Sequence, residues 1–259
     1  MATGNIKEQD SMLSFDGYSP EPEDEGEEPG MSLIEHLEEL RWRIFKSLIA
    51  IAVGSIIAFI FRDNIVIFLR QPLPLGHNTL YLTGITESFT VYLTVAIAAG
   101  FVLALPVLLY QTWAFVSPGL YEKEKKYAVP FIFIGIVLFL VGITLGYFVL
   151  QYPVAFLTTF GGDNFQEILT AGSYFGFIAF FILAFGVIFE MPLVLTFLAY
   201  IDILSSKILQ KKRAVAHVSM WIGATIVMPG ADPYSPVILG ASMSILYELT
   251  IIFMKVLKK

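Results

Sequence analysis

Six apolar stretches, each bounded by charged residues or helix breakers, constrain the fold of this chain more than any other feature of its sequence. A helix needs about 20 mostly apolar residues to cross the hydrocarbon core of a bilayer. A soluble protein would have to bury six consecutive helices that have almost no polar face. The sequence therefore predicts an all-α membrane protein with six transmembrane helices. The stretches are Ile44–Phe61, Ser88–Thr112, Tyr127–Leu150, Tyr174–Tyr200, Ala214–Met228 and Val237–Met254.

The composition agrees with burial in lipid. Hydrophobic residues make up 56% of the 259 residues and charged residues only 15%, with a mean hydropathy of +0.74. A soluble domain usually carries about a quarter charged residues. The fourth stretch is long, which predicts a tilt or a break near Pro192, whereas the fifth and sixth are short.

The first thirty residues differ sharply from the rest. They contain nine acidic residues and one basic residue, Lys7. Such a segment cannot bury enough apolar surface to become ordered, and it lacks the basic start and apolar core of a secretory signal peptide. We expect a disordered acidic tail at 1–30 and a six-span transmembrane domain at 31–259.

The lysines and arginines predict the orientation. With the amino terminus inside, fourteen of them fall in cytoplasmic segments, and only Arg62 and Arg70 fall outside. This is a strong positive-inside bias. We expect both the N and C termini to be cytoplasmic. Outside, Arg62–Arg70 has one apolar side and predicts a short interfacial helix that ends at Pro72.

The segment Met31–Phe45 predicts an amphipathic N-terminal interfacial helix that runs into the first span. Ser32 and Glu35 form a capping box, and leucines recur at helical spacing. On the polar face, the simplest interpretation is that Glu39 pairs with Arg43 one turn later.

The loop after the second span carries Glu122 and Glu124 behind a Pro118-Gly119 turn. Acidic residues there can simply favour the dipole of the next helix. The predicted topology, however, puts this loop and Glu39 on the same face of the membrane. Two carboxylates there could each hold a guanidinium in a bidentate geometry, so a receptor for paired arginines is physically possible.

Glu190 lies inside the fourth span, ten residues from its cytoplasmic end. Helical rise places it about 15 Å deep, near the midplane. A charged carboxylate there costs roughly 2.5–3.5 kcal/mol, so we expect it to be protonated or to face a polar cavity. The alternative is a hydrogen bond to backbone that Pro192 leaves unpaired.

Other kinds of site find little support. The three histidines lie far apart, there is no cysteine, and no metal or cofactor is expected. An intramembrane hydrolase would need paired aspartates or a nucleophile with its base, so we do not expect an enzyme. A proton- or ion-coupled small-solute transporter, with Glu190 as its coupling site, remains an alternative function.

Together these motifs resemble the TatC family, the large subunit of the twin-arginine protein translocase. His36–Arg43 is similar to the family's HLxELRxR signature. Tyr110–Phe115, Pro118–Tyr121 and Glu124 are similar to its first cytoplasmic loop, and Phe185–Pro192 to its fourth span. The resemblance covers residues 31 to about 254, whereas the acidic tail has no counterpart in the family pattern.

The resemblance implies a function and a set of site residues. Members bind twin-arginine signal peptides and, with small single-span partner subunits, export folded proteins across the bacterial cytoplasmic (inner) membrane, driven by the proton-motive force. It implies homo- and hetero-oligomers in the lipid bilayer and no nucleic-acid partner. The residues it implies are Glu39, Glu124, Arg41, Gln111 and Phe115 for signal-peptide binding, Glu190 as an intramembrane polar group, and Pro72 and Asp232 as external-loop residues that matter for transport.

Overall fold

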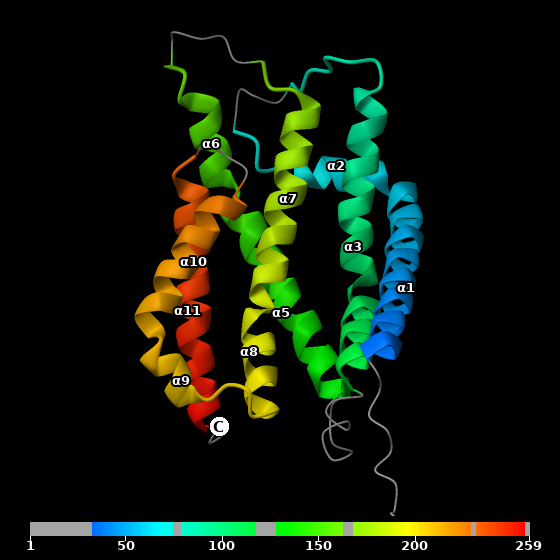
Figure 1. Ribbon diagram of the computed structural model, residues 1–259. Coiled ribbons are helices and arrows are strands. Elements are labelled where there is room, and N and C mark those ends of the chain that lie inside the picture. The colour runs from blue at the N-terminus through cyan, green and yellow to red at the C-terminus, as the bar shows by residue number, and fades with distance from the viewer. Residues whose placement is uncertain (1–32, 75–78, 118–127, 163–167, 229–231, 257–259) are drawn as a thin grey trace, which may run out of the picture. The chain divides into compact units, whose positions relative to one another are not determined.

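The computed structural model describes residues 33–74, 79–117, 128–162, 168–228 and 232–256. These residues are helical apart from short loops and an isolated β-bridge (Figure 1). The helices in chain order are α1 (Leu33–Ile60), α2 (Arg62–Leu69), α3 (Glu87–Val116), α5 (Ala128–Val149), α6 (Gln151–Thr159), α7 (Ala171–Phe189), α8 (Met191–Tyr200), α9 (Ser206–Lys211), α10 (Arg213–Val227) and α11 (Tyr234–Val256).

The chain divides into two units, Met1–Glu38 and Glu39–Lys259. The second unit contains most of α1 and every other described helix. The predicted acidic tail at 1–30 and the capping residue Ser32 lie outside the described residues.

Five helical segments are long and apolar enough to cross a membrane. The described part of the chain is thus an all-helical membrane protein, as its hydropathy predicts. A sixth crossing would have to be made by α10, which has only 15 residues. At helical rise it spans about 22 Å, against about 30 Å of hydrocarbon.

The predicted break in the fourth span is confirmed. This span consists of α7 and α8, which meet at Glu190, and Pro192 is the second residue of α8. A proline has no amide hydrogen for the helical ladder and its ring crowds the preceding turn. The two helices therefore separate just before it.

Two span lengths differ from the prediction. The third continues as α6 to Thr159, with the interruption at Leu150 just before Pro153. The sixth is not short, because α11 begins at Tyr234 and has 23 residues. Pro236 falls in its first turn, where a missing amide hydrogen costs nothing. Prolines that look like boundaries in sequence are therefore inside these helices.

The segment Arg62–Arg70 is helical as predicted and forms α2, which ends at Leu69. It lies crosswise to α3 (Figure 1) and packs against it. The Phe68 and Tyr147 rings stack 4.5 Å apart, and the Tyr147 hydroxyl donates to the Phe68 carbonyl at 3.1 Å. These contacts fix the end of α2 to α5.

Helix α7 packs against both α3 and α5 and carries a row of buried aromatic side chains. Glycines let the backbones approach there. A Cβ atom on Gly142 of α5 would lie 2.8 Å from the Cβ of Phe189, and one on Gly186 would lie 2.7 Å from the Phe139 ring. Lipid gives helices little hydrophobic reason to associate, so such close contacts supply the attraction between them.

Glycines also allow α1 and α3 to pack closely. A Cβ on Gly54 would lie 2.6 Å from the carbonyl oxygen of Gly100, and a Cβ on Gly100 would clash with the backbone and hydroxyl of Ser55. Most other large side chains of α1 are exposed, including Ile56 and Ile60. The glycine crossing is therefore a main packing contact of α1 within the second unit.

We expect Gly54→Leu to destabilise the protein by about 1–3 kcal/mol, because the larger side chain must push α1 away from α3. Thermal unfolding in detergent measures the change. Gly223→Leu is a matched control, since no atom lies within 4 Å of a Cβ placed on Gly223. Equal melting temperatures for the two variants would show that the crossing is not a packing contact.

Candidate functional site

A partly buried guanidinium site joins α1 to α3. Arg43 donates from Nη2 to Glu39 Oε1 at 2.8 Å and from Nε to the same oxygen at 3.2 Å. Its Nη1 donates to Gln111 Oε1 at 3.2 Å, and Nη2 also reaches the Ala114 carbonyl oxygen at 3.3 Å. One arginine thus has a carboxylate, an amide and a backbone carbonyl as acceptors. The predicted pairing of Glu39 with Arg43 is confirmed.

Local sequence explains half of this arrangement. Glu39 and Arg43 are four residues apart on α1, so their side chains lie on one face of the helix. Gln111 and Ala114 are three residues apart on α3 and share a face in the same way. Gln111 is only 9% exposed, and a buried amide needs a partner, which Arg43 provides. Sequence reasoning missed Arg43 as a site residue because it treated the pair as a surface contact.

In the described part of the chain, these hydrogen bonds of Arg43 do not involve the other residues predicted to bind the signal peptide. Arg41 is exposed on α1, and Phe115 is half-buried on α3 next to Ala114. Glu124 lies outside the described residues. The structure therefore brings Glu39 and Gln111 together, while the second predicted carboxylate remains a prediction.

Glu190 lies at the junction of α7 and α8. Both its carboxyl oxygens are buried, and among the described residues neither has a hydrogen-bond partner. This argues against the alternative in which the side chain binds backbone freed by Pro192. Its Oε2 would lie 3.2 Å from a Cβ placed on Gly135, beside Leu109 and Leu193. The carboxyl group is thus held among apolar neighbours.

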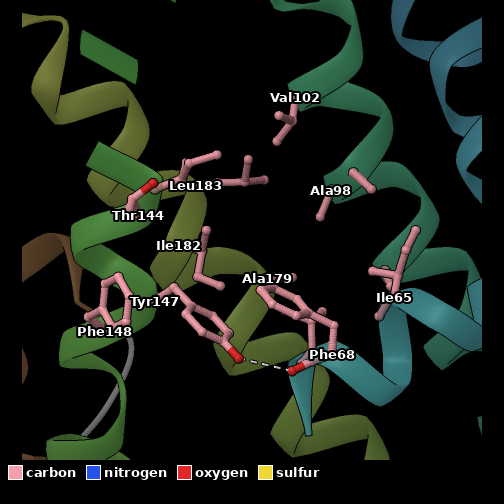
Figure 2. Close-up of a pocket in the computed structure, with 14 residues that line it drawn as sticks. Ile65, Phe68, Ala98, Val102, Thr144, Tyr147, Phe148, Ala179, Ile182 and Leu183 are labelled. Atoms are coloured by element: carbon pink, nitrogen blue, oxygen red, sulfur yellow. Dashed lines mark hydrogen bonds between the residues drawn. The ribbon is translucent and has the colours of Figure 1, made fainter. Parts of the chain in front are cut away.

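A groove of about 380 Å³ opens between α2, α3, α5 and α7 (Figure 2). Its described lining residues carry two side-chain hydroxyls. Thr144 donates to the Leu140 carbonyl at 2.7 Å, and Tyr147 donates to Phe68, as the dashed line shows. Since both hydroxyl hydrogens are engaged, the groove has little with which to recognise a polar solute. This groove therefore gives no support to the small-solute transporter alternative.

Pro72 and Asp232, the two predicted external-loop residues, both lie next to the ends of helices. Pro72 is half-buried in the turn after α2, where the Leu73 amide donates to the Arg70 carbonyl at 3.1 Å. Asp232 is buried and accepts from the amide and the hydroxyl of Ser235, each at 2.7 Å. Asp232 thus provides an acceptor for a backbone amide in the first turn of α11, where the helix itself offers none.

Glu87, which sequence reasoning missed, ties the start of α3 to the start of α7. Its carboxylate accepts from the Gly172 amide at 2.8 Å and the Thr83 hydroxyl at 2.9 Å, and also from the Thr83 and Gly84 amides. Beside it, Tyr81 and Thr170 form the isolated β-bridge. A glutamate in the first turn of a helix is ordinary in sequence, so only the distant partner reveals this role.

A second polar cluster links α10 and α11. Glu248 accepts from Arg213 at 2.6 Å and lies 3.0 Å from His217 Nε2, while His217 Nδ1 lies 3.1 Å from the Ser244 hydroxyl. Sequence reasoning did not single out Glu248. A lone acidic residue inside the last apolar stretch was the available signal.

Comparison with known proteins identifies the family. The profile of the family described as Sec-independent protein translocase protein (TatC) matches residues 35–241. The TatC protein of Desulforapulum autotrophicum is 39% identical over 237 residues, covering 90% of this chain and 87% of that protein. That of Carboxydothermus hydrogenoformans is 40% identical over 233 residues, covering 90% and 96%.

The fold agrees. A crystal structure of the twin-arginine translocase receptor TatC superimposes with a TM-score of 0.74 at 32% identity, covering 87% of this chain and 100% of that one. A second such structure in detergent gives a TM-score of 0.75. The chain therefore belongs to the TatC family of Sec-independent protein translocase proteins.

Proposed function

We propose that this chain, a receptor subunit of the twin-arginine translocase, binds twin-arginine signal peptides at the face formed by Glu39 and Gln111. The observation that carries the proposal is the guanidinium already held there by a carboxylate, an amide and a carbonyl. A set of acceptors that fits one arginine is suited to another, because the planar guanidinium donates in a fixed fork. Glu124, Arg41 and Phe115 complete the proposed surface.

The chain acts with partners. Small single-span subunits join it in homo- and hetero-oligomers, and together they export folded precursor proteins using the proton-motive force. Membership of a translocase family makes it a transport protein and not an enzyme. Glu190 is the proposed intramembrane polar group, and Pro72 and Asp232 are the proposed external residues.

The proposed topology has six spans in the bacterial cytoplasmic (inner) membrane, with α10 as the fifth and both termini in the cytoplasm. The acidic tail at 1–30 precedes this 31–259 domain. Support comes from the fourteen-to-two distribution of basic residues. Because α10 is short, we expect the bilayer to thin beside it.

We expect Glu39→Gln combined with Glu124→Gln to weaken binding of a twin-arginine peptide by roughly tenfold or more, because charge-assisted hydrogen bonds contribute about 1.5–3 kcal/mol each. Fluorescence anisotropy with the detergent-solubilised protein measures the affinity. A Lys-Lys peptide should bind the unmodified protein more weakly than the Arg-Arg peptide.

Glu38→Gln is the matched control, since it removes the same charge from an exposed neighbouring position. Undiminished binding in the double variant, or equal binding of the two peptides, would remove the receptor function from this face.

We expect Glu190→Gln to fold and bind signal peptide normally but to lower transport. Neither carboxyl oxygen has a hydrogen-bond partner among the described residues, so the change breaks no hydrogen bond there. Transport into membrane vesicles and thermal unfolding in detergent together separate the two effects. Full transport activity in this variant would contradict the proposed role.

Single cysteines can test the topology, because the chain has none of its own. We expect a membrane-impermeant maleimide to label Thr86→Cys from outside spheroplasts and to label Lys211→Cys only after the membrane is permeabilised. Both positions are exposed. The reverse pattern would invert the proposed orientation.

A further inference from the structure

The guanidinium site between α1 and α3 is filled by the protein's own arginine. Arg43 uses Nε, Nη1 and Nη2 to contact Glu39, Gln111 and the Ala114 carbonyl, at 2.8–3.3 Å. The Glu39 side chain is 16% exposed and that of Arg43 is 23% exposed. An incoming arginine that used the same acceptors would have to take the place of this one.

We propose that Arg43 is an internal competitor for the signal peptide, so that binding exchanges the Arg43 guanidinium for one arginine of the twin-arginine pair at Glu39, Gln111 and the Ala114 carbonyl. This inference rests on the proposed receptor function. It gives Arg43 a role in setting the affinity of the site, a role that the family resemblance did not assign to it.

The exchange avoids the main cost of binding a charge at a partly buried site. Removing one member of a buried ion pair is strongly destabilising, because the other charge is left without compensation. When one guanidinium replaces another, Glu39 keeps a cationic partner and Gln111 keeps a donor. The total charge at the acceptors stays the same throughout.

Arg43 can leave without any movement of the helix. Its side chain has several rotatable bonds, it is partly exposed, and α1 is exposed on either side of it at Trp42 and Ile44. Once displaced, the long side chain of Arg43 can extend along the surface of α1 and carry its guanidinium toward the aqueous end of the helix. Glu39 and Gln111 stay in place because each belongs to a long helix.

Competition of this kind means that only a ligand with high intrinsic affinity for the acceptors binds measurably. Arg43 lowers the affinity of every ligand by the same factor, because the same internal contacts must be broken each time. A lysine ammonium cannot reproduce the planar fork that reaches three acceptors at once. A lysine pair therefore starts from a weaker affinity, and the competition brings its binding below a useful level.

The test is the affinity of Arg43 variants for an Arg-Arg peptide and a Lys-Lys peptide, measured by fluorescence anisotropy on the full-length protein. Arg43→Lys keeps the charge but loses the fork, and Arg43→Gln loses the competitor. We expect both to bind both peptides more tightly, by roughly three- to tenfold for Arg43→Gln and less for Arg43→Lys. The ratio between the two peptides should stay unchanged.

Lys46→Gln is the matched control, because it removes one positive charge from an exposed position of the same helix. It should leave affinity nearly unchanged, which separates competition at Glu39 from general attraction of a cationic peptide. Thermal unfolding checks that the Arg43 variants are folded, and Arg43→Lys retains the charge needed to pair with Glu39.

Weaker or unchanged binding in either folded Arg43 variant overturns the exchange, since a purely structural or peptide-contacting arginine gives that result. An equal gain in Lys46→Gln overturns it as well. If the unmodified protein binds the Arg-Arg peptide through Glu39 but the Arg43 variants do not gain affinity, the receptor function stands and only the exchange fails. If the unmodified protein does not bind the peptide at all, the proposed function itself fails.

Discussion

A chain surrounded by hydrocarbon must satisfy its backbone hydrogen bonds within its own helices, and it gains little from burying one apolar face against another. The helices of this protein therefore depend on close approach. Gly54 meets Gly100 between α1 and α3, Gly142 meets Phe189, and Gly186 meets Phe139 between α5 and α7. The α5–α7 contacts hold those two helices together, and the α1–α3 crossing places α1 where Arg43 can reach α3.

Polar groups then join the helices mainly near their ends. Arg43 connects α1 to the last turns of α3, and Glu87 connects the opposite end of α3 to the start of α7. Helix α3 is thus tied to a different neighbour at each end. Between these ties the interior is apolar, and Glu190 is an exception that the packing leaves with no hydrogen-bond partner among the described residues. An unpaired carboxyl group in such surroundings is a cost that packing alone does not explain, which supports the proposal that Glu190 serves transport.

The sequence predicted the helical membrane class, the break before Pro192 and the helix α2, because hydropathy, proline and charge act locally. It placed the start of α11 too late and the end of the third span too early. Pro236 lies in the first turn of α11 and Pro153 in the first turn of α6, where a proline is compatible with helix. Whether a proline ends a helix depends on where the helix begins, and that is decided by contacts such as Asp232 with Ser235.

In the candidate site, too, sequence spacing predicted some contacts and not others. The spacing of Glu39 and Arg43 was sufficient to predict their ion pair, since residues four apart share a helix face. Spacing carried no information about Gln111, the Gly172 amide that holds Glu87, or the Glu248 that binds Arg213, because each partner lies on another helix. The sequence alone thus determined the membrane-helix class, most of the helices and the pairs within a helix, because those follow from short-range periodicity. The tertiary structure alone decided which helices meet and therefore which charges share acceptors, because packing brings together residues that are distant in the chain.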